Sequence, residues 1–147
     1  MSHTEELRRT EAKLLPPGYQ HGFNFKYLID EKEGFVEIDG WNPTTREAIE
    51  ICQSESGQDS PKPGQKRKLA SDVLKLVFLL TQGLISRGRV YVTSPELYTW
   101  FHHADSWLSA SCRYFGIAVE LRQHDNKTTR RRIKNILREE RKASKHS

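Results

Sequence analysis

The sequence predicts a single domain of the α/β class, and three observations lead to that prediction. Segments whose apolar residues alternate with period two are interleaved with segments of helical period, in the order helix, three strands, helix, strand, helix, strand. A length of 147 residues suits one compact domain with a core of ordinary size. Hydrophobic residues make up 35% of the chain and aromatic residues 10%, which is too much for a disordered chain.

The first half of the chain predicts one helix and three strands. A charged helix over residues 4–15 is stopped by Pro16-Pro17-Gly18. Residues 22–29 and 35–40 alternate apolar with polar side chains on either side of a charged turn, 30–34, and so predict a hairpin. A third, isoleucine-rich strand is expected over residues 47–53.

The second half predicts alternating helices and strands. After a loop over residues 54–64, apolar residues at the spacing of one helical face predict a helix over 65–82. A strand over 89–93 is followed by one long helix from Pro95 to Phe115, capped by Ser94. The last strand is expected over 117–121.

Positive charge is concentrated at the C-terminal end. Residues 127–147 carry nine Lys or Arg and two Glu, whereas the other 126 residues carry fifteen Lys or Arg and seventeen Asp or Glu. We therefore expect a single domain over residues 1–126 and a basic tail over 127–147, partly helical or disordered. Clustered cations favour a polyanionic partner, nucleic acid first, although a solvated tail that only keeps the protein soluble is the alternative. The candidate nucleic-acid-binding residues of the tail are Arg130, Arg131, Arg132 and Lys134.

Several classes of protein are excluded or disfavoured. No apolar run is long enough to span a membrane and the N-terminus lacks the apolar core of a secretory signal, so a cytoplasmic protein is expected. Cys52 and Cys112 are expected to be free buried thiols. The sequence contains no nucleophile elbow, no phosphate-binding loop of the G-x-x-x-x-G-K-[ST] type and no zinc-ligand spacing.

Two acidic residues on neighbouring strands are the strongest candidates for chemistry. Asp39 lies in FVEIDG and Glu50 in AIEIC. Two carboxylates at the ends of adjacent strands can share Mg²⁺ or Mn²⁺, a hard ion that keeps waters able to attack a phosphodiester. Because Ile49 and Ile51 should pack on the opposite side of the sheet, we expect Glu50 to share a face with Cys52. The alternatives are a turn-forming Asp39 and an edge carboxylate at Glu50 paired with a cation.

The order of elements and these acidic residues resemble the PD-(D/E)XK nuclease superfamily over roughly residues 4–93. The resemblance implies a restriction-endonuclease-like αβββαβ core with a mixed central sheet, here with one further helix and strand and a basic C-terminal helix or tail. It also implies a Mg²⁺- or Mn²⁺-dependent nuclease that cleaves DNA rather than RNA, with Asp39 and Glu50 as metal ligands. The first helix of such nucleases can supply a further acidic residue, which would be Glu6 or Glu11 here.

The chain departs from the family pattern at Cys52, where a lysine is expected. A thiol cannot supply the positive charge that steadies the attacking water. Some members carry that lysine on the following helix, which makes Lys68 the first candidate and Lys66 the second, with Gln53 as a further polar residue near the site. Without such a lysine, the fold would serve as a catalytically inactive module for nucleic-acid binding or assembly.

Two further surfaces are candidates for partners. Lys62, Arg67 and their neighbouring lysines surround the start of the predicted helix 65–82, where backbone N–H groups favour phosphate; a solvated loop is the alternative. On the predicted long helix, Trp100, Trp107 and Tyr114 form an aromatic stripe with His103. We expect this stripe to be buried or to form a homodimer contact, with base stacking as the less favoured interpretation.

Overall fold

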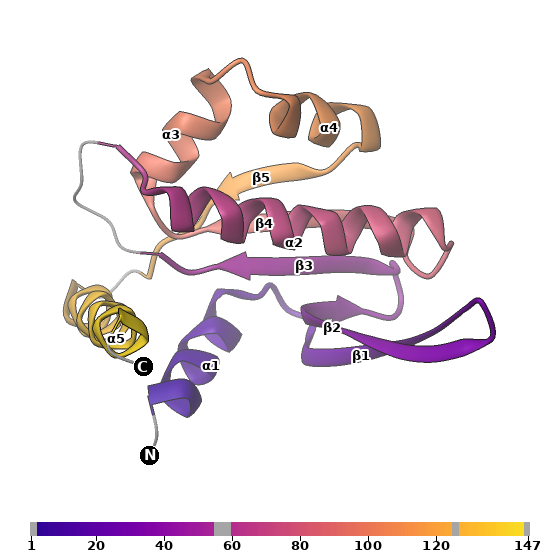
Figure 1. The fold of residues 1–147 in the computed structure, drawn as a ribbon. Coiled ribbons are helices and arrows are strands. Elements are labelled where there is room, and N and C mark those ends of the chain that lie inside the picture. The colour runs from indigo at the N-terminus through magenta and orange to yellow at the C-terminus, as the bar shows by residue number, and fades with distance from the viewer. Residues whose placement is uncertain (1–2, 55–59, 125–126, 146–147) are drawn as a thin grey trace.

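The computed structural model describes residues 3–54, 60–124 and 127–145, and its strands form one sheet (Figure 1). The strands lie side by side in chain order: β1 (Gln20–Ile29), β2 (Lys32–Asn42), β3 (Glu47–Cys52), β4 (Arg87–Val92) and β5 (Ala118–Leu121). The first three pair antiparallel, and β3, β4 and β5 pair parallel. The expected α/β class with a mixed sheet is therefore confirmed.

Helices cover both faces of this sheet. They are α1 (His3–Leu14), α2 (Pro63–Thr81), α3 (Pro95–His103), α4 (Trp107–Phe115) and α5 (Lys127–Lys145). Buried residues of α2, α3 and α4 pack in one cluster with the sheet, and α1 supplies Leu14 to a smaller cluster around Ile49 and Ile51. Because side chains alternate along β3, these two isoleucines face α1, and the neighbouring positions face α2.

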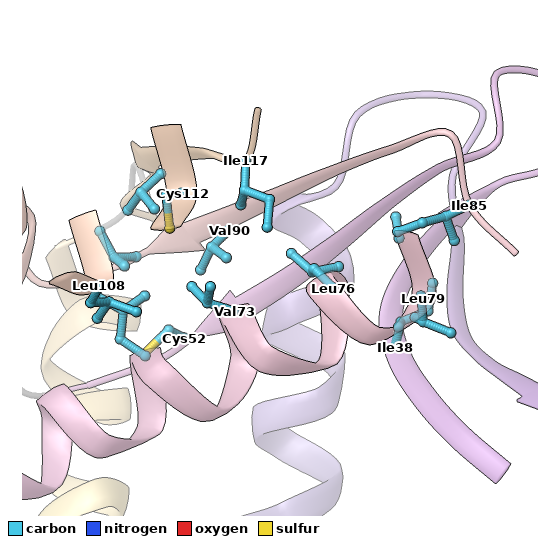
Figure 2. Packing of buried hydrophobic residues seen from close by; sticks show 14 of the residues in the cluster. Ile38, Cys52, Val73, Leu76, Leu79, Ile85, Val90, Leu108, Cys112 and Ile117 are labelled. Carbon is cyan, nitrogen blue, oxygen red and sulfur yellow. The ribbon is translucent and has the colours of Figure 1, made fainter. Parts of the chain in front are cut away.

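The main core lies between α2 and the sheet (Figure 2). Leu76 of α2 and Val90 of β4 are both fully buried there. Cys112 of α4 joins this cluster, as does Cys52 at the end of β3. Both cysteines are free and buried, as the sequence predicted.

The β1–β2 hairpin turns more tightly than the sequence predicted. Ile29 pairs directly with Lys32, so the turn consists of Asp30 and Glu31 alone, with φ angles of 51° and 65°. Positive φ at both central positions is typical of a two-residue type I′ turn, whose twist matches that of the flanking strands. The predicted five-residue turn over 30–34 is therefore wrong, because residues 32–34 belong to β2.

The predicted long helix over 95–115 is also wrong, since the structure contains two helices there. The chain becomes extended at Ala104, with ψ of 132°, and Ser106 then caps α4 by accepting a hydrogen bond from the Ser109 N–H. A serine whose side chain bonds to the backbone offers an alternative to helix continuation. Gly116 ends α4 with a left-handed conformation at φ 69°.

Most of the basic segment 127–147 forms a helix that packs on the domain. In α5, Ile133 and Ile136 are buried, although most of the helix is polar. Arg132 of α5 forms an ion pair with Glu6 of α1 at 3.1 Å, which joins the two terminal helices. Within the described residues, no helix has the length and apolar character needed to cross a membrane.

Candidate active site

The two predicted carboxylates meet where β2 and β3 separate. The backbone pairing of these strands runs from Asn42–Glu47 to Gly40–Ile49, and Asp39 and Glu50 come next on the two strands. There the Asp39 N–H donates to Glu50 Oε1 at 3.1 Å, and the Ile51 N–H donates to Asp39 Oδ2 at 2.7 Å. Carboxylate oxygens thus accept hydrogen bonds that backbone carbonyls accept in a regular sheet. These bonds hold both carboxylates at the place where the two strands separate.

Glu50 is buried beneath α2. Its side chain is 1% exposed, and its Oε2 accepts a hydrogen bond from Lys75 Nζ at 3.0 Å. Burial raises the pKa of Glu50 well above the usual range of a glutamate, and the nearby charges of Asp39 and Asp72 raise it further, although Lys75 opposes this. Glu50 therefore lies on the α2 face of the sheet, as the alternation along β3 predicted.

A third carboxylate, Asp72, reaches the site from α2. Asp72 is 4% exposed and pairs with Lys68 one turn earlier, at 3.3 Å between Lys68 Nζ and Asp72 Oδ2. Burial raises the pKa of Asp72, while Lys68 lowers it. Burial would by itself lower the pKa of Lys68, but Asp72 and the other anionic groups nearby raise it, so Lys68 stays charged.

The first helix contributes Glu11 and not Glu6. The pKa of Glu11 is raised to about 7 by burial and by the charge of Asp39, against the lowering effects of Gln53 and Lys68. Glu6 instead pairs with Arg132 on the molecular surface. Gly40, next to Asp39, packs closely against Leu15, the residue that follows α1: a Cβ added at Gly40 would lie 2.5 Å from Leu15 Cδ2, so the leucine side chain would have to shift.

Gln53 lies against α1, on the side of β3 opposite Glu50. Its Nε2 donates to the Leu7 carbonyl at 3.3 Å, and its Oε1 is buried without a hydrogen-bond partner in the structure. An unpartnered buried amide oxygen is costly, and functional sites are where such groups occur most readily.

Negative charge exceeds positive charge in this site. Within the described residues, Lys68 and Lys75 are the cations beside Asp39, Glu50 and Asp72, and Glu11 also has the charge of Arg8 nearby and the His21 ring at 3.5 Å. Carboxylate oxygens suit a hard divalent cation, and Mg²⁺ usually takes one or two protein carboxylates and keeps several waters. Asp39 and Glu50 fit that pattern. In the described part of the chain, no group of three or more His, Cys, Asp or Glu is arranged as a ready cation cage.

Cys52 stands at the position where a lysine was expected from the sequence, and it cannot replace one. Its side chain is completely buried in the core beneath α2. Burial, and then the charge of Asp72, raises the pKa of this thiol to about 12. Because only the thiolate is a good nucleophile or metal ligand, Cys52 is chemically inert at neutral pH.

The remaining predicted cations lie away from the carboxylates. Lys66 stacks on the Trp100 ring at 4.7 Å from its centroid, so the structure places it toward α3. Lys62 precedes α2, where its N–H donates to Gln65 Oε1 at 2.9 Å. Arg67 is exposed and borders a groove of α2 and α4 that Trp107 also lines. Of the predicted lysines, Lys68 alone is brought to the site.

Sequence reasoning missed Lys75, although a signal for it existed. Lys68, Asp72 and Lys75 recur at positions i, i+4 and i+7, which lie on one face of a helix. Lys68 was chosen because it borders the apolar face of the helix in line with Asp72, and the same line was not continued to Lys75.

The predicted aromatic stripe is divided between two helices. Trp107 and Tyr114, both on α4, are 80% and 84% exposed. Trp100, on α3, lines a different groove with Pro61 and His103. A homodimer contact through this face stays a prediction, and α4 would supply most of it.

Comparison with known proteins gives no assignment: no family model, no curated protein and no solved structure matches this chain. What the chain does must be inferred from its own residues.

Proposed function

We propose that the chain is a metal-dependent endonuclease with a restriction-endonuclease-like core, which hydrolyses phosphodiester bonds in nucleic acid. The observation that carries the proposal is the pairing of Asp39 and Glu50 where β2 and β3 separate, inside a cluster with excess negative charge. Strongly shifted pKa values produced by burial and like charges mark functional sites more often than structural ones. The preference for DNA over RNA comes from the family resemblance alone.

Asp39 and Glu50 are the residues that would hold Mg²⁺ or Mn²⁺. The ion would supply an activated water and would withdraw charge from a phosphoryl oxygen. For Glu50 to serve as a ligand, Lys75 must give up its hydrogen bond to Oε2, and its flexible, partly exposed side chain allows this.

Glu11 and Lys68 are placed to assist hydrolysis. In the reaction, a water oxygen forms a bond to phosphorus, the bond from phosphorus to a sugar oxygen breaks, and the water loses a proton. A carboxylate with a pKa of about 7 suits a general base at neutral pH, and Glu11 is such a group. Lys68, which stays charged between Asp72 and Asp39, can balance negative charge on the phosphoryl oxygens in place of a lysine at position 52.

Exposed cations would hold the polynucleotide around this site. Lys62 and Arg67 lie at the start of α2, and α5 adds Arg131 and other basic side chains. Contacts of this kind to phosphates fix the position of a strand without reading its sequence.

A catalytically inactive nucleic-acid-binding or assembly module is the second candidate. It is favoured by Cys52, because no lysine follows Glu50 at the expected spacing and the buried thiol cannot act in its place. The Lys75 contact to Glu50 also supplies a cation without any metal. In that case the fold would bind nucleic acid through its basic surfaces only.

Cleavage of supercoiled plasmid and of single-stranded DNA and RNA, with Mg²⁺ or Mn²⁺, tests the proposal. Asp39→Asn and Glu50→Gln should each lower the rate by about a thousandfold, because each removes a ligand charge. Glu33→Gln is the matched control: Glu33 is an exposed carboxylate of β2, paired with Lys26, and its replacement should leave the rate unchanged. Cleavage that persists in both site variants would place the activity elsewhere, and binding without cleavage by the wild type would favour the inactive module.

A further inference from the structure

A small pocket lies at the edge of the sheet where the three parallel strands end. Ser54 follows β3, Thr93 follows β4 and Gln123 follows β5, and all three residues line it. Helix α5 lies beside this edge (Figure 1) and lines the pocket with Arg130, Ile133 and Lys134. The carboxyl ends of parallel strands are a common place for ligand sites in α/β proteins.

The pocket is sized for a compact group. It holds about 20 Å³ of space for the centres of water-sized atoms, and a single water needs about half to three quarters of that. A tetrahedral oxyanion fits this space, whereas a nucleobase or a sugar ring does not. Shape therefore selects for a small ligand or for one group of a larger one.

The chemistry of the lining favours an anion. Arg130 and Lys134, at i and i+4 on α5, both line the pocket, and no carboxylate is found among its described lining residues. The Ser54 Oγ atom is buried and has no hydrogen-bond partner in the structure, so a donor is available. The Ser54 N–H donates to Thr93 Oγ1 at 3.1 Å, which fixes the two loop ends relative to each other.

Arg130 is held in place at the pocket, unlike the exposed Arg131. One of its guanidinium nitrogens donates to the His124 carbonyl, and the residue is half-buried. Arg131 is exposed, and Arg132 is engaged with Glu6. The basic helix is therefore not uniform: Arg130 and Lys134 line a formed pocket, whereas Arg131 faces solvent and Arg132 faces the first helix.

We propose that this pocket binds one phosphate group of a nucleic-acid strand that occupies the site of Asp39 and Glu50. The inference rests on the proposed function, because it takes that strand as the source of the phosphate. Ser54 follows Glu50 by four residues, so their α-carbons lie at most about 13 Å apart along an extended chain. That distance corresponds to a few nucleotides, so one strand can reach both places. The phosphate is either a terminal monoester or a backbone diester.

Titration of the full-length protein with inorganic phosphate, without divalent metal and followed by the amide NMR signals of Ser54, Thr93 and Gln123, tests the pocket directly. Arg130→Gln and Lys134→Gln should each weaken binding by about tenfold through the loss of a charge-assisted hydrogen bond. Arg113→Gln removes the same charge from an exposed position of another helix, α4, outside the pocket, and should bind as the wild type does. Circular dichroism melts establish that each variant is folded.

Absence of saturable shifts at these amides would overturn the proposal. An equal loss of affinity in Arg113→Gln would do so too, because the attraction would then come from general charge and not from a site. Since the titration requires neither metal nor cleavage, its result is separable from the nuclease proposal: phosphate binding without cleavage would leave an anion site on a non-nuclease, and cleavage without phosphate binding would remove this pocket alone.

Single strands of equal length with a 5′-phosphate or a 5′-hydroxyl distinguish the two sources of the group. Tighter binding of the phosphorylated strand, lost in Arg130→Gln, would identify a terminal phosphate. Equal binding of both strands, weakened alike in Arg130→Gln, would identify a backbone phosphate. If Arg130→Gln binds both strands as tightly as the wild type does, the proposal is contradicted.

Discussion

Glu47 and Glu50 lie on the same strand, three residues apart and on opposite faces, and their surroundings differ in charge balance. Glu47 Oε1 accepts a hydrogen bond from Arg89 Nε at 2.8 Å and another from the Tyr19 hydroxyl, and Glu47 Oε2 lies 3.4 Å from Arg87. Glu50 has one lysine, Lys75, and two nearby carboxylates, Asp39 and Asp72, whose charges act on it. A buried charge that is fully paired supports the fold, whereas one that is under-compensated is a cost that function explains better.

The ion pairs around Glu47 continue across the sheet to β5. Arg89 contacts Glu120 of β5 at 3.0 Å, and Arg122 pairs with the same glutamate at 3.3 Å. Burial would by itself lower the pKa of Arg89, but the hydrogen bonds that Arg89 donates to Tyr19 and Glu47 raise it. The network thus ties β3, β4 and β5 together on the face opposite α2, and the carboxylate cluster on the α2 side has no comparable set of cations.

The largest expected effect comes from breaking the paired region. Glu47→Gln should lower the free energy of unfolding by about 3 kcal/mol, because it leaves Arg89 partly buried with an incomplete set of partners. Urea unfolding of the two proteins measures this. Glu33→Gln, which breaks an exposed pair, should cost less than about 0.5 kcal/mol. A cost for Glu47→Gln as small as that of the control would remove the contrast between the two glutamates.

The next prediction tests which lysine assists cleavage at the site of Asp39 and Glu50. Lys68→Met should lower the cleavage rate by about a hundredfold, since a positive charge beside the reacting phosphate is lost. Lys66→Met should have a smaller effect, because Lys66 lies over Trp100. Steady-state cleavage rates of the two variants decide the question. A larger loss in Lys66→Met than in Lys68→Met would reverse the assignment.

The pH dependence of stability gives a smaller but more specific effect. The pKa of Glu11 is about 7 in the folded protein, against 4.5 for a model glutamate, so folding favours its protonated form. The stability that this group contributes is complete below about pH 4.5 and is lost as the pH rises through 7. We expect the free energy of unfolding to fall by on the order of 1 kcal/mol per pH unit within that window. Glu11→Gln should flatten the profile, as urea unfolding between pH 5 and 8 would detect.

An unchanged pH profile in Glu11→Gln would assign the proton uptake to other groups. Glu50 and Asp72 are the other candidates, since the raised pKa of each has the same sign of effect on stability. The pH dependence of the free energy of unfolding of Glu50→Gln then shows how much of the effect belongs to Glu50.

The sequence allowed much of the fold and part of the site to be predicted. Alternation along residues 47–52 placed Glu50 on the face of Cys52, and hydrophobic spacing located α2, so the carboxylate pair and Lys68 could be chosen. The separation of β2 and β3 at Asp39 could not be predicted, because it depends on hydrogen bonds between the strands. There the carboxylates of Asp39 and Glu50 accept from backbone N–H groups in place of backbone carbonyls.

Errors arose where local signals conflicted. Ala104 to Ser106 interrupts a stretch of helical period, because the Ser106 cap outweighs continuation of the helix. The role of Ile133 and Ile136 was only hinted at by sequence, since burial of a mostly charged helix depends on the surface that receives it. The partner of Glu50, Lys75, required the contact between α2 and β3 to be known.

The unfolding free energy of the wild type and of Glu50→Gln, measured with and without Mg²⁺ at pH 8, tests the central claim most directly. If Glu50 is an under-compensated metal ligand, Glu50→Gln is the more stable protein without metal, by about 1 kcal/mol, and Mg²⁺ stabilises the wild type alone. If Glu50→Gln is less stable than the wild type and Mg²⁺ affects both proteins equally, Glu50 is a structural partner of Lys75 and the proposed metal site is wrong.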